Sequence, residues 1–402
     1  MKKVLPFLLL PFATHYLNPE QMGTVQLLNQ AATLLTPIAL LGSTWGSKRD
    51  YYKLPFEQFR QRWTSAFWLP LFTMTCISVI CFLGRNYLLP LFDIAPEWWW
   101  YLPVTALLWA WWELVFGSMR VLKMPKQLGI LQNTSVLAEI LLVLFFIISL
   151  QMRIEGMLAA QLISASITVA VALFIVLKYN FFDPRLSLKT FINYAFRDLG
   201  FLPLAFFFVF LKLSDRFLVG YFWGREGLGY YSVAFGLSSA VVLVLRSFTL
   251  AYTPWLFEQL AKNTPASVQK INRSLAFIIG GIILSTTGAA LVLPLVFVLF
   301  FSKQYLPSLP YLFPAILIGA LFSAGQLLNG FYIYFEKSKT VNLQGVALLL
   351  LLGLTAYFEK QHGSNMQTML YSLVVVHAAM LLVNIGLIRR FFPLFKAPLL
   401  SN

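Results

Sequence analysis

The chain has 402 residues, of which 59% are hydrophobic and only 11% charged, and its formal net charge is +15. A soluble domain carries about 25% charged residues, and no soluble fold of this size could hide so much apolar surface. With a mean hydropathy of +0.75, this composition excludes an ordinary soluble domain and predicts an integral membrane protein. Cys76 and Cys81 lie in one apolar run, so they form neither a disulfide framework nor a metal-ligand motif.

Apolar runs recur along the chain, separated by short loops that carry Pro, Gly and charge. We predict twelve membrane spans, at residues 4–17, 24–42, 64–83, 98–116, 128–150, 156–177, 200–222, 230–253, 274–300, 312–334, 343–358 and 368–388. The predicted fold class is an all-α polytopic membrane protein with two six-helix lobes around a central cavity. The expected N-terminal lobe is residues 1–180 and the expected C-terminal lobe is residues 181–402.

The first run is short, because a span needs about 20 residues. We expect the first helix to be clipped at its cytoplasmic end. Either it is short and thins the bilayer locally, or the true start of the protein lies upstream.

Basic residues predict the orientation of the chain. With a cytoplasmic N-terminus, the inside segments hold 22 of the 30 Lys and Arg residues and the outside loops hold 5. Such a bias predicts that both termini are cytoplasmic, and it explains the positive charge without a nucleic-acid partner. The basic, aromatic segment from Lys48 to Trp63 is expected to lie on the anionic inner leaflet. Trp98 to Tyr101, which open the fourth span, are expected to be interfacial aromatics.

The two halves of the chain share a faint repeat. Glu20-Gln21-Met22-Gly23 follows the first span, and Glu226-Gly227-Leu228-Gly229 follows the seventh, at an offset of 206 residues. Each half then holds six spans, an even number, so both halves enter the membrane in the same direction. We therefore predict two lobes that are related by an axis along the membrane normal.

Ionisable residues inside predicted spans are costly and are candidates for function. Lys212, Asp215 and Arg216 in the seventh span are spaced so that the latter two neighbour Lys212 on the helix. Arg246 lies in the eighth span. Lys212, Arg216 and Arg246 form a predicted ladder of cations, which suits an anionic cargo such as a phosphate or pyrophosphate.

Three acidic residues lie in predicted spans: Glu113 in the fourth, Glu139 in the fifth and Asp215 in the seventh. No nucleotide-binding motif is present, so transport would run on an ion gradient or on the gradient of the cargo. These carboxylates are the candidate proton or sodium carriers. The alternative is structural, with Glu113 and Glu139 forming salt bridges to the cations of the ladder.

Polar residues form stripes at helical spacing in several spans. Gln26, Asn29 and Gln30 mark the second span, and Gln326 and Asn329 mark the tenth. Lipid cannot satisfy such groups, so these faces turn toward neighbouring helices or a wet cavity. They are candidates for binding a glycan, with helix–helix packing as the alternative. The sixth span carries a further stripe: Gln161, Ser164 and Thr168.

Signals for enzymatic chemistry are weak. His15, His362 and His377 are scattered, and no Ser/His/Asp set, metal motif or phosphate-binding loop is present. We expect that the protein is not an enzyme and that it has no cofactor and no metal site.

Two stretches resemble a known family. Leu17-Asn18-Pro19-Glu20-Gln21-Met22-Gly23 resembles the L-s-P-e-e-x-G loop after the first helix of bacterial polysaccharide-export proteins. Asp215-Arg216-Phe217-Leu218, followed by Gly227-Leu228-Gly229-Tyr230-Tyr231-Ser232, resembles their D-r-x-x-L … v-G-x-Y-S signature. The chain thus resembles lipid-linked oligosaccharide flippases (O-antigen or capsule unit translocases) of the multidrug/oligosaccharidyl-lipid/polysaccharide exporter superfamily.

This resemblance implies a two-lobe, twelve-helix transporter that works by alternating access in the bacterial cytoplasmic membrane. Its cargo would be a short glycan on undecaprenyl pyrophosphate, moved from the inner to the outer leaflet for surface polysaccharide biosynthesis. Expected partners are the lipid-linked oligosaccharide, membrane lipids and the polysaccharide polymerase machinery. The cationic ladder would hold the pyrophosphate, and the polar stripes would meet the sugars.

Two alternatives remain open. A cation-coupled multidrug exporter of the same superfamily should favour carboxylates and aromatics, because its cargo is usually cationic. Intramembrane Lys and Arg equal the acids in number here, which favours an anionic cargo. A membrane enzyme such as a polysaccharide polymerase would need a large extramembrane loop with convergent polar residues, and the predicted spans leave none.

Overall fold

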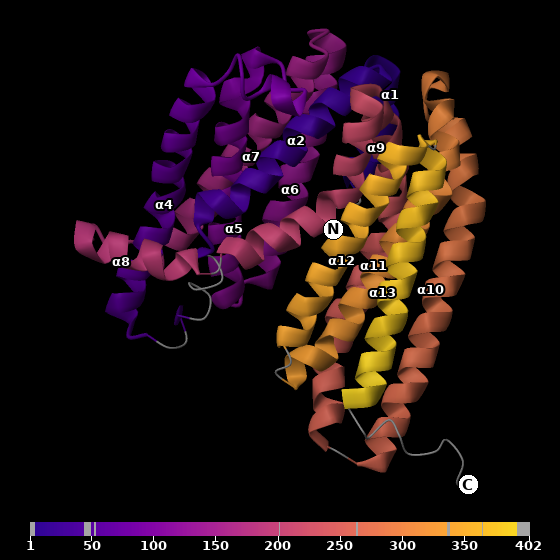
Figure 1. The fold of residues 1–402 in the computed structure, drawn as a ribbon. Helices are drawn as coiled ribbons and strands as arrows, with labels where there is room; N and C mark the ends of the chain where they lie inside the picture. The colour runs from indigo at the N-terminus through magenta and orange to yellow at the C-terminus, as the bar shows by residue number, and fades with distance from the viewer. Residues whose placement is uncertain are drawn as a thin grey trace. The chain divides into compact units, whose positions relative to one another are not determined.

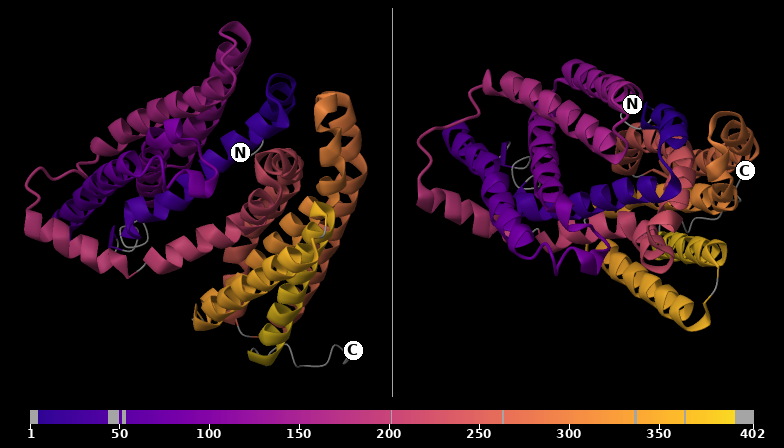
Figure 2. Two further views of the ribbon diagram at one scale, coloured as in Figure 1. Left: turned by 45° about the horizontal axis from the view of Figure 1, so that its top comes forward. Right: turned by 90° about the horizontal axis from the view of Figure 1, so that it is seen from above.

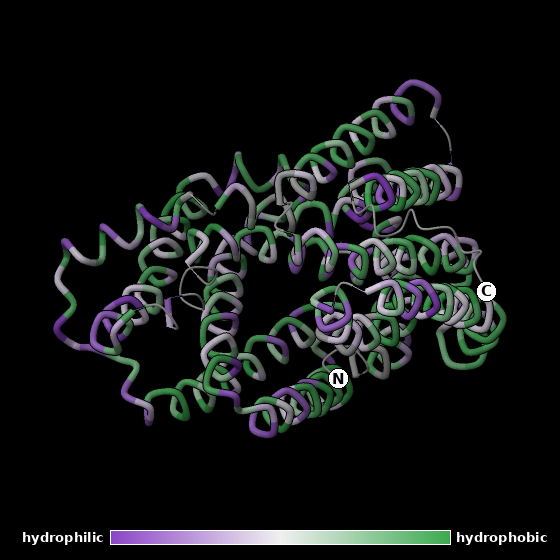
Figure 3. Tube along the Cα trace, turned by 90° about the horizontal axis from the view of Figure 1, so that it is seen from below, coloured by the Kyte–Doolittle hydropathy of each residue, from purple (hydrophilic) through white to green (hydrophobic). Residues whose placement is uncertain are grey.

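The computed structural model describes residues 5–43, 50–51, 54–200, 202–262, 264–335, 338–363 and 365–391, and this part of the chain contains helices and turns but no strand. Its α-helices are α1 (Leu5–Tyr16), α2 (Pro19–Leu40), α4 (Phe56–Leu83), α5 (Tyr101–Val121), α6 (Pro125–Leu144), α7 (Ile154–Leu177), α8 (Leu188–Leu199), α9 (Leu202–Lys262), α10 (Pro265–Phe300), α11 (Leu309–Tyr334), α12 (Ser338–His362) and α13 (Met366–Phe391) (Figure 1). Hydrophobic residues predominate along them (Figure 3).

The chain divides into two compact units, Met1–Gly229 and Tyr230–Asn402. The first unit contains α1 to α8 and the first part of α9, and the second contains the rest of α9 and α10 to α13. The boundary that we predict between the lobes, after residue 180, stays a prediction.

Each predicted span falls on a helix of the described residues. In the described part of the chain, nine candidate spans are long and apolar enough to cross a membrane. The difference from twelve has three sources. α1 has only 12 residues, α2 is made less apolar by its polar stripe, and α9 counts once although two predicted spans lie on it.

α9 contains a break that separates these two spans. Its 61 residues would extend about 90 Å as one helix, three times the thickness of a bilayer core. Gly224 has φ 62° and ψ −162°, a conformation outside the helical region. This region of φ and ψ is open essentially to glycine alone. Gly224 therefore ends one helical segment and starts the next.

The core of the first unit joins α4 to α5 and to the loop after α7. Phe59, Trp63, Phe116 and Phe181 are among its buried side chains. Trp63 donates from Nε1 to Oγ of Ser118 at 2.8 Å. The C-terminal end of the segment Lys48–Trp63 belongs to α4, which buries Phe59 and Trp63 and leaves Phe56 exposed, and the expectation that this segment lies on the inner leaflet stays a prediction. Residues 48–49 and 52–53 of that segment lie outside the described residues.

α8 is an amphipathic helix that sequence analysis did not identify. Ser187 caps it by accepting a hydrogen bond from the backbone N–H of Thr190 at 3.2 Å. Leu188, Ile192 and Phe196 are exposed along one side, at the spacing of one helix face. α8 crosses α4 in the view of Figure 1, and Figure 2 shows its path into α9.

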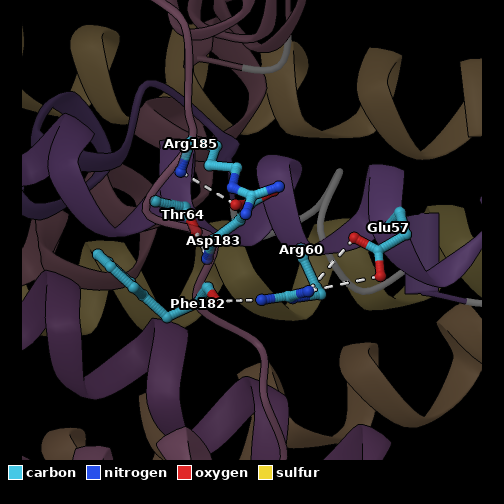
Figure 4. Close-up of polar contacts among 6 residues, drawn as sticks. All are labelled: Glu57, Arg60, Thr64, Phe182, Asp183 and Arg185. Carbon is cyan, nitrogen blue, oxygen red and sulfur yellow. Dashed lines mark hydrogen bonds and ion pairs between the residues drawn. The ribbon is translucent and has the colours of Figure 1, made fainter.

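The loop before α8 is fastened to the first turns of α4 (Figure 4). Arg60 donates to the carbonyl oxygen of Phe182 at 2.9 Å, and the backbone N–H of Asp183 donates to Oγ1 of Thr64 at 2.8 Å. The Asp183 carboxylate accepts from the backbone N–H of Arg185 at 3.0 Å. These bonds fix where the chain leaves the α7 side of the unit and enters α8.

In the second unit, a polar link joins α11, α12 and α13. Gln344 donates from Nε2 to the Tyr332 hydroxyl and to Oδ1 of Asn384, each at 3.2 Å. The Tyr332 hydroxyl donates to the backbone carbonyl of Asn384 at 3.1 Å. Tyr332 is fully buried, so its hydroxyl needs these partners.

Candidate functional site

A polar network lies inside the first unit, where α2, α5 and α7 meet. The hydroxyl of Tyr101 lies 3.0 Å from Oδ1 of Asn29 and 3.3 Å from Oε1 of Gln161. Tyr101 has no exposed surface. One phenol proton can serve only one acceptor, so one of the two amides turns its NH₂ group toward the hydroxyl. The network thus brings together polar groups from three apolar helices.

Glu139 of α6 acts on this network electrostatically. Its carboxylate is half-buried and lies within coulombic range of the Tyr101 hydroxyl. A carboxylate in a membrane-spanning helix is costly unless polar neighbours compensate it. Glu139 within electrostatic range of the Tyr101 hydroxyl is an arrangement that can hold a proton or a small cation.

The other polar residues of α2 differ in their surroundings. Gln30 is 1% exposed, and neither atom of its amide has a hydrogen-bond partner within the described protein. A buried amide without partners costs about 1–3 kcal/mol per group. Gln26 is partly exposed. Gln30 is therefore the position on α2 where a hydrogen bond to a bound polar molecule would be most favourable.

Lys212, Asp215 and Arg216 lie on the first part of α9, before Gly224. Asp215 and Arg216 are 5% and 8% exposed, and Lys212 is exposed. Glu113 of α5 is exposed too. Two adjacent candidates, Asp215 and Arg216, are thus buried. Lys212 and Glu113 remain accessible.

The remaining candidates belong to the second unit. Arg246 lies on α9, and its side chain is outside the described residues. Gln326 and Asn329 lie on α11, where Asn329 donates from Nδ2 to Oε1 of Gln326 at 3.5 Å. A ladder of Lys212, Arg216 and Arg246, and a glycan wall built from both halves, stay predictions.

A second polar centre, also in the first unit, is a group of four charges, of which Arg62, Asp50 and Asp198 are buried and Arg197 is exposed. Arg62 donates from Nε to Oδ2 of Asp50 at 3.1 Å and lies 2.5 Å from Oδ2 of Asp198 through Nη2. Arg197 pairs with the same oxygen of Asp50. Arg62 and Asp198 are fully buried. This ion-pair cluster fastens α8 to α4 and to residue 50.

Aromatic stacking and burial tune the ion-pair cluster. The guanidinium groups of Arg62 and Arg197 lie 5.2 Å and 5.0 Å from the centre of the Tyr194 ring, within cation–π range. Burial raises the pKa of Asp198 above its usual range, and Arg62 and Arg197 oppose that shift. Desolvation outweighs the two guanidinium groups because the carboxylate has lost its contact with water.

Sequence reasoning missed the residues that organise both centres. Tyr101 looked like one more interfacial aromatic because it follows three tryptophans, whereas its hydroxyl joins three helices. Arg62 looked like one more basic residue of an inside segment. The available signal was Asp50 and Asp198, acidic residues set within two strongly basic stretches.

Within the described residues, no group of three or more His, Cys, Asp or Glu side chains could hold a metal ion.

Known structures share the fold of this chain. No protein-family model matches the sequence, and no curated protein matches it. An inward-facing multidrug resistance MATE family transporter of the MOP superfamily is 14% identical, with a TM-score of 0.77 over 98% of this chain and 96% of that one. The outward-facing conformation of such a transporter gives a TM-score of 0.62 at 14% identity, over 99% of this chain and 96% of that one.

A third similar structure is a MOP superfamily transporter from Pyrococcus furiosus, for which a binding pocket of reverse polarity suggests a different function. It is 14% identical, with a TM-score of 0.65 over 99% of this chain and 93% of that one. At this identity the likeness shows the fold. The chain is a multi-pass membrane protein with the fold of these transporters, and the predicted all-α polytopic class with twelve helices in two lobes is confirmed. The central cavity stays a prediction.

Proposed function

We propose that this chain is a membrane transporter that works by alternating access, without enzymatic chemistry of its own. The observation that carries the proposal is the likeness of nearly the whole chain to transporters of one superfamily. The polar network around Tyr101 supports it, because the half-buried carboxylate of Glu139, within electrostatic range of this network inside a membrane unit, suits ion coupling. We assign to Glu139 the role of carrying the coupling proton or sodium ion.

The first candidate function is export of small molecules coupled to a cation. The structural neighbours favour it, since several of them are multidrug transporters. In this function Glu139 would exchange a proton or sodium ion during the cycle. Cationic drugs would be attracted by the carboxylates of Glu113, Glu139 and Asp215.

Translocation of a lipid-linked oligosaccharide is the second candidate, and sequence features favour it. The loop ending at Gly23 and the signature that begins at Asp215 resemble those of polysaccharide-export proteins. The same fold hosts cargo sites of different polarity, as the P. furiosus transporter suggests. In this function Lys212, Arg216 and Arg246 hold a pyrophosphate, and Gln26, Asn29, Gln30, Gln326 and Asn329 contact sugars.

Both candidates place the protein in the bacterial cytoplasmic membrane with cytoplasmic termini. The excess of Lys and Arg in the predicted inside segments supports this orientation. For the second candidate, membrane lipids and the polysaccharide polymerase machinery are the partners that its product would require.

Deletion of the gene in its host separates the two cargo classes. A flippase predicts intact lipid-linked repeat units trapped on the cytoplasmic leaflet, with surface polysaccharide lost and not restored by Arg216→Ala. An exporter predicts normal surface polysaccharide and higher retention of a cationic dye, not restored by Glu139→Gln. Wild-type behaviour in both assays would contradict the proposed function.

A further inference from the structure

The two repeat motifs of the sequence touch each other in the folded chain. An alanine Cβ built on Gly23 would lie 1.7 Å from the carbonyl oxygen of Arg225. One built on Gly229 would lie 1.8 Å from the carbonyl oxygen of Pro19. Separations this short are impossible for real atoms, so only glycine fits at both positions. The backbones of the two segments, residues 19–23 and 225–229, are in direct contact.

The contact is reciprocal under the repeat. The offset of 206 residues relates Pro19 to Arg225 and Gly23 to Gly229. Gly23 therefore meets the equivalent of Pro19, and Gly229 meets Pro19 itself. A contact in which i touches j and j touches i is what a two-fold axis produces. The faint repeat of the sequence is thus a local two-fold relation in space.

Other positions of the two segments follow the same relation. Asn18 caps the start of α2 through its side chain, and its equivalent Gly224 starts the second part of α9 with φ 62°. Met22 and Leu228, which correspond, are 3% and 1% exposed. Two different ways of starting a helix thus place equivalent residues at equivalent depths.

The contact fits closely but is held weakly. Each glycine Cα directs a hydrogen at a carbonyl oxygen, a C–H···O interaction that is weak individually. Arg225 also pairs with Asp93 at 3.0 Å, with side chains 34% and 56% exposed, and exposed pairs contribute little. Small residues permit such close approach of helices in membranes. A contact with these properties can form and break at low cost, provided that neither glycine gains a side chain.

We propose that this glycine contact, Gly23 with Arg225 and Gly229 with Pro19, is a gate on the predicted outer side of the membrane. The gate is closed when the two segments touch and open when they separate. The inference rests on the proposed function, because alternating access requires one side to open while the other closes. It assigns the two glycines as the residues that set the closed state.

Distance measurement tests the contact without any cargo. In a background of Cys76→Ala and Cys81→Ala, spin labels at Glu20→Cys and Glu226→Cys report the separation of the segments, since both positions are exposed. We expect a short-distance and a long-distance population, whose ratio changes with pH or sodium. Gly23→Ala and Gly229→Ala should each remove the short-distance population. A single unchanging distance would overturn the gate.

Gly129→Ala is the matched control, because a Cβ there has nothing within 4 Å and Gly129 lies on α6 of the same unit. It should keep both populations. If Gly129→Ala removes the short-distance population as Gly23→Ala does, the contact does not set the closed state and the inference fails.

Cross-linking separates a gate from a permanent joint and needs no glycine substitution. A short bifunctional thiol reagent applied to the Glu20→Cys/Glu226→Cys protein should stop transport, and a cleavable version should restore it on reduction. Undiminished transport by the cross-linked protein would overturn the gate and leave the proposed function standing. No transport by the untreated protein, with both distance populations present, would count against the proposed function alone.

Discussion

Arg62 shows how one residue can hold several elements together. It is fully buried and pairs with Asp50 and Asp198, which come from segments more than a hundred residues apart. In Arg62→Ala, the buried carboxylate of Asp198 loses its ion pair while Asp50 is left with Arg197, and breaking a buried pair in this way costs about 3–5 kcal/mol. We expect a marked fall in Tm of the detergent-purified protein. Lys262→Ala, which removes an exposed pair with Glu258, should leave Tm nearly unchanged, and equal effects would contradict the role of the ion-pair cluster.

Asp198 adds a pH dependence to the same cluster. Burial raises its pKa in the folded protein, whereas the unfolded value is about 3.9. Its contribution to the free energy of unfolding is therefore fully present below pH about 4 and is lost as the pH rises through the raised pKa. Across that window, the Tm of the wild type should fall relative to Asp198→Asn. Parallel Tm curves for the two proteins would show that this carboxyl does not titrate as described.

At the same scale, the sequence indicates which residues are costly to bury, but it gives no contacts between segments. Glu139 stands out as a lone acid in an apolar run. Its proximity to Tyr101 depends on how α5, α6 and α7 pack, and helical spacing within one span says nothing of that. Aromatic residues are harder still, because a tyrosine that links helices and one that lies at the interface have the same sequence surroundings.

At the scale of elements, Gly224 divides α9. Its φ of 62° and ψ of −162° are accessible essentially to glycine, and a Cβ there would meet nothing within 4 Å. Gly224→Ala should therefore lower the free energy of unfolding by about 1–3 kcal/mol through backbone strain alone. Thermal unfolding of the purified protein measures the effect.

Gly220→Ala is the control for that prediction, because it lies in the preceding segment of α9 and its Cβ would make an ordinary contact of 3.6 Å with Leu228. It should be neutral or stabilising, since alanine favours helix by up to about 1 kcal/mol over glycine. If Gly220→Ala is as destabilising as Gly224→Ala, the break in α9 does not require glycine.

Most elements could be predicted because length and hydropathy determine them. The twelve predicted spans fall on helices, and the predicted separation of the seventh from the eighth coincides with Gly224. α8 was missed because its apolar residues recur at helical spacing inside a polar segment, where no long apolar run marks them. Its position also depends on the ion pairs of Asp198 and on the loop bonds of Asp183, which are tertiary contacts.

At the scale of the whole molecule, the fold and the cargo are separate questions. The layout of spans follows from the hydropathy of the sequence, and the all-α class agrees with the structural neighbours, whereas the orientation stays a prediction. The residues that we predict to contact cargo come from both compact units, including Arg246 and Asn329 of the second, and their role stays a prediction. Drug export and the translocation of an anionic lipid-linked glycan, for which the motifs near Gly23 and Asp215 speak, therefore both stay proposals.

Transport by the purified protein in liposomes tests the central claim most directly. A cationic fluorescent dye and a fluorescent lipid-linked pyrophosphate glycan would be offered under a proton or sodium gradient. We predict that the wild type moves one of them faster than protein-free liposomes do, and that Glu139→Gln abolishes its response to the gradient. Movement of neither cargo above the protein-free rate, by protein whose Tm shows that it is folded, would contradict the account.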